Sequence, residues 1–122
     1  MTRRRRLVVA IYLTAVGVVT LAPLPSGAAT ELLGSGFDKA IHALIIGGLA
    51  LVLLWRPEPP RLPAALAVVG ASMAVAALIE LAQIPLPYRS GELYDFLAGA
   101  SGGLVATGLY LAMRGGHARR AD

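Results

Sequence analysis

Two short patterns in this sequence place groups that could exchange protons or bind a ligand on one face of a helix. Asp38 and His42 are four residues apart, and Glu80 and Gln83 are three apart. Residues at these spacings lie on the same side of a helix, so each pair can act on one target. Because histidine changes charge near neutral pH and carboxylates take up and release protons, the patterns suit general acid and base chemistry. The alternative for His42 is a histidine satisfied within a helix bundle.

Glu80 is the strongest single candidate for a functional group. It lies about 27 Å along an apolar segment that starts at Leu62, at about 1.5 Å per residue, near the far edge of the hydrocarbon if that segment spans a membrane. A carboxylate there is costly unless it faces the protein interior, water or a cation. Lys39 and Arg89 are the available cations. Arg89 could instead bind a phosphate or carboxylate through its two-pronged guanidinium, or be a plain loop charge.

The residue types also limit which cofactors the site could use. The sequence has no cysteine, which excludes disulfides, thiolate metal sites and cysteine nucleophiles. A histidine and several carboxylates suit a divalent ion in principle, but no zinc-binding spacing is present and we predict no metal. No phosphate-binding glycine loop, nucleophile elbow or nucleotide motif is present either, so we predict no cofactor.

The elements that must position these groups are four apolar segments. The composition is 57% hydrophobic and 15% charged, against roughly 25% charged in an ordinary soluble domain. The segments cover about residues 7–24, 40–55, 62–84 and 96–113, and three of them are near the short end of the roughly 17–25 residues that span a bilayer. Prolines separate them. The sequence therefore predicts an all-α integral membrane bundle of four transmembrane helices with short loops, forming a single domain over residues 1–122.

The basic residues predict how this bundle is oriented. With the N-terminus inside the cell, only Lys39 and Arg89 are outside. The nine cytoplasmic basic residues are Arg3, Arg4, Arg5, Arg6, Arg56, Arg61, Arg114, Arg119 and Arg120. By the positive-inside rule, both termini are cytoplasmic. The net charge of +4 therefore indicates a topology signal, and no nucleic-acid partner is expected. Alternatively, the first segment is a secretory signal cleaved near Ser26–Ala29.

Small residues in the fourth segment predict close helix packing. Gly99 and Gly103 form a G-x-x-x-G spacing, and Gly102 lies on an adjacent stripe. We expect three acidic loop residues to be solvated: Glu31, Glu58 and Glu92. We expect the aromatic residues Trp55 and Tyr88 to lie at the membrane interface as anchors.

Three motifs in order resemble those of the VanZ-like family of small bacterial membrane proteins. Residues 38–42 match the family's D-K-x-x-H motif, and residues 80–83 match its E-x-x-Q motif. Arg89, followed by Asp95, resembles the R…D element, and Gly102 resembles a glycine seven residues further on. The resemblance covers about residues 7–113. Two positions depart from the pattern: Gly99, where the family usually has asparagine, and Ile46, where it often has tyrosine.

The resemblance implies a role in the cell envelope at the outer face of the bacterial inner membrane. The family is named for a protein that lowers susceptibility to the glycopeptide teicoplanin. The implied ligand is amphiphilic: a lipid-linked wall precursor, a phospholipid headgroup or a lipophilic glycopeptide. We predict catalytic candidates and ligand-binding candidates in one outward-facing site: Asp38, His42 and Glu80 for catalysis, and Lys39, Gln83, Arg89 and Asp95 for binding.

Two further hypotheses stay open at this point. The same site could be an enzyme that performs acyl or phosphoryl chemistry on a lipid, with His42 and Glu80 exchanging protons and Arg89 stabilising an oxyanion or phosphate. Alternatively, the chain could be a purely structural helical partner of another membrane protein or of a second copy of itself, with the glycines forming the interface.

Overall fold

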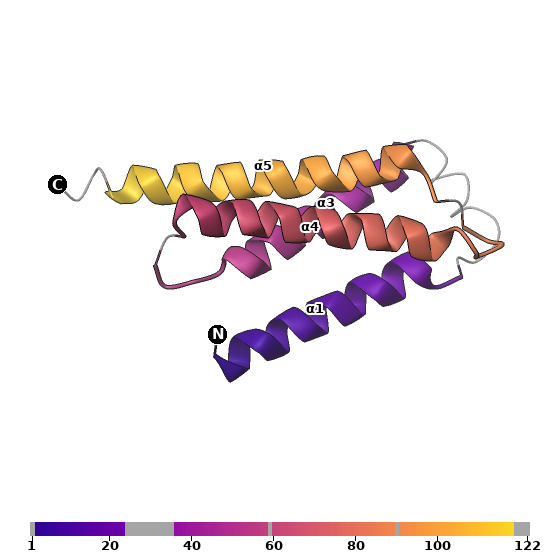
Figure 1. Ribbon diagram of the computed structural model, residues 1–122, viewed down its shortest axis with the longest axis horizontal. Coiled ribbons are helices and arrows are strands. Elements are labelled where there is room, and N and C mark those ends of the chain that lie inside the picture. Colours follow the sequence, from indigo (N-terminus) through magenta and orange to yellow (C-terminus); the bar gives the residue numbers. More distant parts are fainter. Residues whose placement is uncertain (1, 24–35, 59, 90, 119–122) are drawn as a thin grey trace.

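A computed structural model describes residues 2–23, 36–58, 60–89 and 91–118, without the side chains of residues 116–118. In these described residues the chain forms four helices and no strands: α1 (Arg3–Leu21), α3 (Asp38–Leu54), α4 (Leu62–Gln83) and α5 (Leu93–Ala118) (Figure 1). The predicted all-α class is confirmed. Leu24, the candidate cleavage site at Ser26–Ala29, and Glu31 lie outside the described residues.

Local sequence explains where the helices begin and end. The Thr2 hydroxyl accepts a hydrogen bond from the Arg5 amide, so α1 begins within the arginine run, earlier than the predicted residue 7. Pro63 lies in the first turn of α4, where a missing N–H costs nothing. The prolines at 57, 85 and 87 follow the ends of α3 and α4, as predicted.

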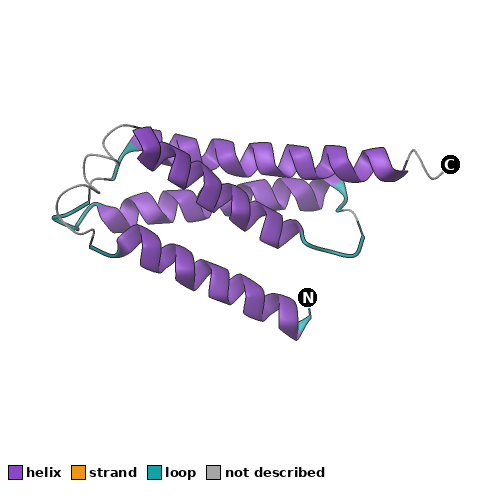
Figure 2. Cartoon of the chain, turned by 180° about the vertical axis from the view of Figure 1, so that it is seen from behind, coloured by secondary structure: helices purple, strands orange, loops and turns teal. Residues whose placement is uncertain are grey.

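The helices are antiparallel to their neighbours in sequence, and α3 makes its largest contact with α5 (Figures 1 and 2). The core follows α3, where Ile46, Ala50 and Leu54 are fully buried. Helix α4 packs against both α3 and α5. Helix α1 lies at the edge of the bundle and diverges from the other helices toward its N-terminus (Figure 1). Its C-terminal half joins the core through Val16.

The predicted glycine packing is the means by which α3 and α5 approach. A Cβ atom at Gly102 would lie 2.1 Å from the carbonyl oxygen of Ala43, and one at Gly47 would lie 3.1 Å from the carbonyl oxygen of Gly102. A Cβ atom at Gly99 would lie 3.1 Å from Cγ1 of Ile46 on α3, and one at Gly103 would lie 3.1 Å from Cβ of Ser72 on α4. The backbones of α3 and α5 are therefore in direct contact, and only glycine allows this contact at position 102.

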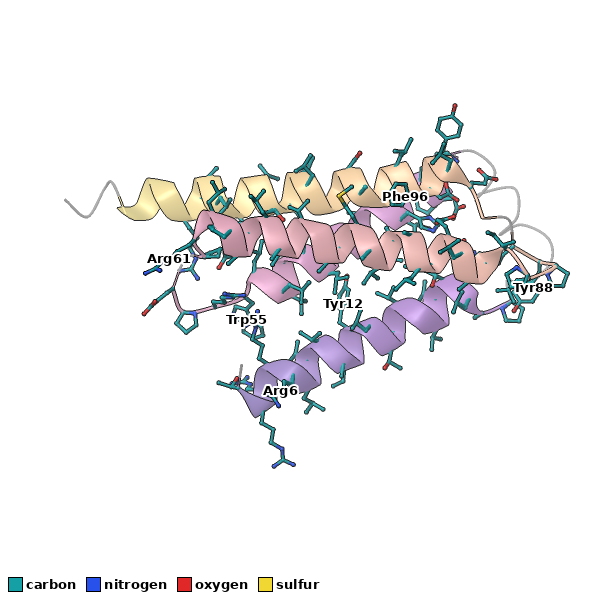
Figure 3. All side chains as sticks on the ribbon, in the orientation of Figure 1. Arg6, Tyr12, Trp55, Arg61, Tyr88 and Phe96 are labelled. Atoms are coloured by element: carbon teal, nitrogen blue, oxygen red, sulfur yellow. The ribbon has the colours of Figure 1, made fainter. Side chains whose placement is uncertain are left out.

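Two of the four helices are long and apolar enough to cross a membrane: Leu62–Gln83 and residues Leu93–Gly115 of α5. In their most apolar stretches only 28% and 17% of the residues are buried, whereas the core helix of a soluble protein is mostly buried. Helix α3 has 17 residues, and α1 opens with four arginines that shorten its apolar part. Large apolar side chains such as Leu44, Leu66 and Leu104 are more than 60% exposed, and Figure 3 shows side chains projecting outward along every helix.

Candidate functional site

The N-terminal ends of α3 and α5 and the C-terminal end of α4 meet at one end of the bundle (Figure 1). This antiparallel arrangement brings together the ionisable residues that the sequence predicts for these helix ends. We call them, with Glu92, the polar cluster: Asp38, Lys39, His42, Glu80, Glu92 and Asp95. Five of the seven predicted site residues therefore lie in one group.

Asp95 is the most deeply buried carboxylate of the polar cluster. It is 2% exposed, and its Oδ1 atom lies 3.1 Å from the ammonium nitrogen of Lys39. The same ammonium lies 3.5 Å from Oε2 of Glu92 at the cluster's rim. A buried carboxylate requires a compensating charge, and Lys39 supplies it while its own side chain stays half-exposed.

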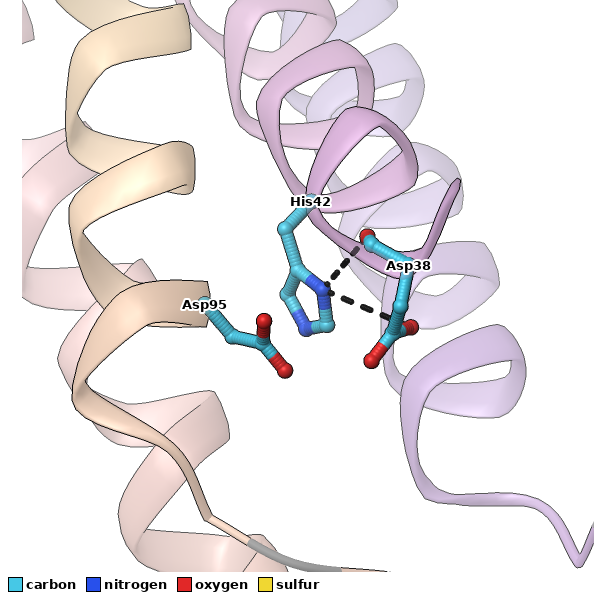
Figure 4. A group of neighbouring side chains, drawn as sticks. All are labelled: Asp38, His42 and Asp95. Carbon is cyan, nitrogen blue, oxygen red and sulfur yellow. Dashed lines mark hydrogen bonds and ion pairs between the residues drawn. The ribbon is translucent and has the colours of Figure 1, made fainter. Parts of the chain in front are cut away.

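His42 joins the carboxylates of α3 and α4. Its Nδ1 atom lies 3.0 Å from the backbone carbonyl oxygen of Asp38 and 3.8 Å from that residue's Oδ1 (Figure 4). Because a carbonyl oxygen can only accept, this geometry assigns the proton to Nδ1. The Nε2 atom lies 3.5 Å from Oε1 of Glu80. Two groups that can each accept a proton thus face one another, which is the arrangement that proton exchange requires.

Glu80 is held in place by the loop that follows α4. Its Oε2 atom accepts a hydrogen bond of 2.9 Å from the backbone N–H of Glu92, which leaves Oε1 directed at His42. Gly91 permits this contact, because a Cβ atom there would lie 2.7 Å from the carbonyl oxygen of Glu80. The side chain is 12% exposed, so most of it is buried within the protein.

Glu92 is the member of the polar cluster that sequence reasoning missed. Its side chain is 48% exposed, as expected for a solvated residue, but its carboxylate pairs with Lys39 and its amide binds Glu80. Its position directly before α5, three residues from Asp95, is the one sequence feature that could have indicated it.

The other two predicted site residues contact α1 instead. The Gln83 side-chain amide donates to the carbonyl oxygen of Thr20 at 2.8 Å and is fully buried. Arg89 donates to the carbonyl oxygens of Val19 and Ala22, both at 3.2 Å. These are carbonyls at the end of a helix, where a cation is favourable. Both residues secure α1 to the bundle in this structure, and their role in ligand binding stays a prediction.

Asp38 lies before the apolar stretch that begins at residue 40, at the first residue of α3. Burial raises the pKa of this carboxyl, and the neighbouring Asp95 raises it further, while His42 and Arg89 act in the opposite direction. Burial first, and the neighbouring Asp95 second, therefore make proton uptake easier at Asp38.

Three side chains of the polar cluster have a geometry that a metal ion could use. Ligand atoms of Asp38, His42 and Asp95 all lie within 4.8 Å of one another, and Figure 4 shows the His42 ring between the two carboxylates. The Lys39 ammonium already lies 3.1 Å from Asp95 and supplies positive charge there. The prediction that the site binds no metal stays a prediction.

The two departures from the family pattern contact one another. A Cβ atom at Gly99 would lie 3.1 Å from Cγ1 of Ile46, which is fully buried. An apolar side chain and a glycine thus fill the layer beneath the polar cluster, where the resemblance would place tyrosine and asparagine.

Comparisons with known proteins give no match. No family model fits the chain, and neither a curated protein nor a solved structure is significantly similar to it.

Proposed function

We propose that this chain is a VanZ-like protein of the bacterial inner membrane whose polar cluster binds an amphiphilic ligand of the cell envelope at the outer face. The observation that carries the proposal is the convergence of buried ionisable groups at one end of an otherwise apolar helix bundle. Burying Asp95 and His42 to 5% exposure or less is costly, so such groups within a membrane bundle usually serve a function.

All four helices span the membrane in this proposal, with both termini in the cytoplasm. At about 1.5 Å per residue, α3 is about 26 Å long, which reaches across a bilayer with slight thinning or with its polar ends at the interface. The basic residues Arg3–Arg6, Arg56, Arg61 and Arg114 all lie at the end of the bundle opposite the polar cluster, in support of this orientation.

The charges of the polar cluster indicate what kind of ligand it prefers. Four carboxylates stand against one ammonium and one histidine: Asp38, Glu80, Glu92 and Asp95 against Lys39 and His42. This balance favours an amino group on the ligand, next to an apolar tail that lies along the exposed helix faces. Lipid-linked wall precursors, aminophospholipid headgroups and lipophilic glycopeptides all combine these features.

The facing pair His42 and Glu80 supports a second candidate, a membrane enzyme. With Nδ1 protonated, Nε2 of His42 can take a proton from a hydroxyl or amine, and Glu80 can pass a proton to the leaving group. Acyl or phosphoryl transfer on a lipid would use this pair. A third candidate is a purely structural role, in which the chain packs against another membrane protein or a second copy of itself. Only the exposed apolar helix faces support this candidate.

Substitutions that remove the ionisable groups of the polar cluster test these functions against one another. Glu80→Gln and His42→Gln should abolish a change in teicoplanin susceptibility or in envelope composition while membrane abundance stays normal. Ser101→Ala, which removes an exposed hydroxyl from α5 outside the polar cluster, is the control and should behave as wild type. A structural role predicts lost abundance or assembly instead.

Mass spectrometry of envelope lipids separates binding from catalysis. Cells with the wild-type protein should show a modified lipid or wall precursor only if the protein is an enzyme, and Glu80→Gln should remove that product. An unaltered lipid profile together with a Glu80-dependent susceptibility change supports binding alone. Normal behaviour of both Glu80→Gln and His42→Gln contradicts both site functions.

A further inference from the structure

A cavity of about 960 Å³ lies at the end of the bundle opposite the polar cluster. It is formed by the start of α1, the end of α3 and the loop after it, the start of α4 and the end of α5. Figure 3 shows Arg6, Trp55 and Arg61 at this end of the molecule. The cavity is thus separate from the proposed outer site.

The lining of this cavity is strongly basic. Five guanidinium groups line it: Arg4 and Arg5 from α1, Arg56 and Arg61 from the connection between α3 and α4, and Arg114 from α5. Among the described lining residues Glu58 is the only carboxylate. Trp55, which is 58% exposed, forms part of the same wall. Five cations around one concave surface repel one another unless an anion lies among them.

Two of these guanidinium groups are held by the backbone. Arg114 donates to the carbonyl oxygens of Arg56, at 2.8 Å, and Pro57, at 3.4 Å, and its side chain lies over the Tyr110 ring. Arg5 donates to the carbonyl oxygen of Leu53 at the end of α3. These contacts fix the direction of the remaining N–H groups.

Buried donors in the wall have no partner within the described part of the chain. The Nε atoms of Arg5 and Arg56 are buried and make no hydrogen bond there. A buried donor without an acceptor is costly, and a guanidinium N–H is best matched by an anionic oxygen. The wall therefore combines a net positive charge with guanidinium groups whose donors the described residues do not fully satisfy.

We propose that this cavity binds a phosphate group, with an anionic phospholipid headgroup as its source. Arginine forks match the oxygens of a phosphate, and basic pockets between helices on the cytoplasmic side of a membrane suit anionic headgroups. Trp55 belongs at the depth where a headgroup meets the acyl chains. A topology signal needs the charges but needs neither the cavity nor the fixed guanidinium groups.

The single tryptophan of the chain gives a direct assay. The full chain is reconstituted in phosphatidylcholine vesicles that contain a fixed fraction of brominated phosphatidylglycerol or of brominated phosphatidylcholine. Bromine quenches nearby tryptophan, so Trp55 should be quenched several-fold more by the anionic lipid. The double variant Arg4→Gln, Arg5→Gln should lose this preference.

The matched control is the double variant Arg3→Gln, Arg6→Gln. It removes the same charge from the same helix turn, but neither residue lines the cavity. It should keep the preference for the anionic lipid. Arg61→Gln, an exposed residue at the start of α4, provides a second test if the Arg4 and Arg5 variant loses helix content by circular dichroism.

Inorganic phosphate distinguishes the two sources of the phosphate group. If Trp55 shows no lipid preference but its emission changes on titration with phosphate and not with chloride, and the Arg4 and Arg5 variant abolishes that change, the site takes soluble phosphate. The proposal is overturned if neither probe affects Trp55 or if both double variants reduce the response equally, because a diffuse surface charge then explains the result.

Discussion

Replacing Gly102 by alanine perturbs the closest helix contact in the bundle. The added Cβ would lie 2.1 Å from the carbonyl oxygen and 2.7 Å from the Cα of Ala43. Both distances are more than 0.5 Å shorter than a normal contact, which is about 3.5–4.0 Å between carbon atoms. Both neighbours are backbone atoms, so no side chain can move aside. The two helices must separate, and the packing of Gly47 and Ile46 on α5 loosens with them.

The expected cost of Gly102→Ala follows from this forced separation. Overpacking of a close-packed interface costs about 1–3 kcal/mol, and the gain from replacing a helical glycine offsets about 0.5–1 kcal/mol of it. We expect a net loss of about 1–2 kcal/mol in the free energy of unfolding. Gly108→Ala on the same helix meets nothing within 4 Å and should be neutral or slightly stabilising.

Unfolding in mixed detergent micelles, followed by far-ultraviolet circular dichroism, measures both variants against wild type. A Gly102→Ala protein as stable as Gly108→Ala would refute the direct backbone contact between α3 and α5.

Three further predictions concern the polar end of the bundle. Arg89→Gln should speed hydrogen exchange at the backbone amide of Ala22, whose N–H binds the Val18 carbonyl, by about tenfold, because losing a typical hydrogen bond costs about 1.4 kcal/mol. Arg114→Gln is the control and should leave the exchange rate of Ala22 unchanged. Equal exchange rates in wild type and Arg89→Gln would contradict the contact of Arg89 with α1. Because the pKa of Asp38 is raised in the folded state, its contribution to stability is present at acidic pH and is lost as the pH rises through that raised value. Asp38→Asn should therefore gain stability relative to wild type as the pH rises above about 4, the ordinary pKa of an aspartate. A difference in unfolding free energy that does not change with pH would oppose this. Nitrogen-15 NMR should find neutral His42 protonated at Nδ1, with His117→Gln used to assign the signal, and an Nε2-protonated ring would remove the proposed orientation.

The helices and the convergence of the polar groups could be predicted because both depend on local sequence. Long apolar runs between prolines require helices wherever they lie in lipid or pack together. Connecting such helices by short loops makes neighbours antiparallel, so Asp38, Glu80 and Asp95 had to meet at one end. The close packing at Gly102 followed from the small-residue spacing.

The directions of Gln83 and Arg89 could not be predicted, because each depends on how α1 rotates and docks. Gln83 contacts Thr20, 63 residues away, and Arg89 contacts Val19 at a separation of 70. No spacing within α4 or its loop encodes that contact. Glu92 was missed for a similar reason, since its amide reaches Glu80 only through the path of the loop at Gly91.

Labelling of single cysteines in intact cells tests most directly whether the polar cluster faces the outside of the cell. The chain has no cysteine of its own, so Tyr94→Cys and Glu58→Cys each introduce one exposed thiol, at opposite ends of the bundle. A membrane-impermeant maleimide should label the variant at Tyr94 in intact spheroplasts and the variant at Glu58 only after lysis. Labelling in the reverse order would place the polar cluster in the cytoplasm and contradict the proposed envelope function.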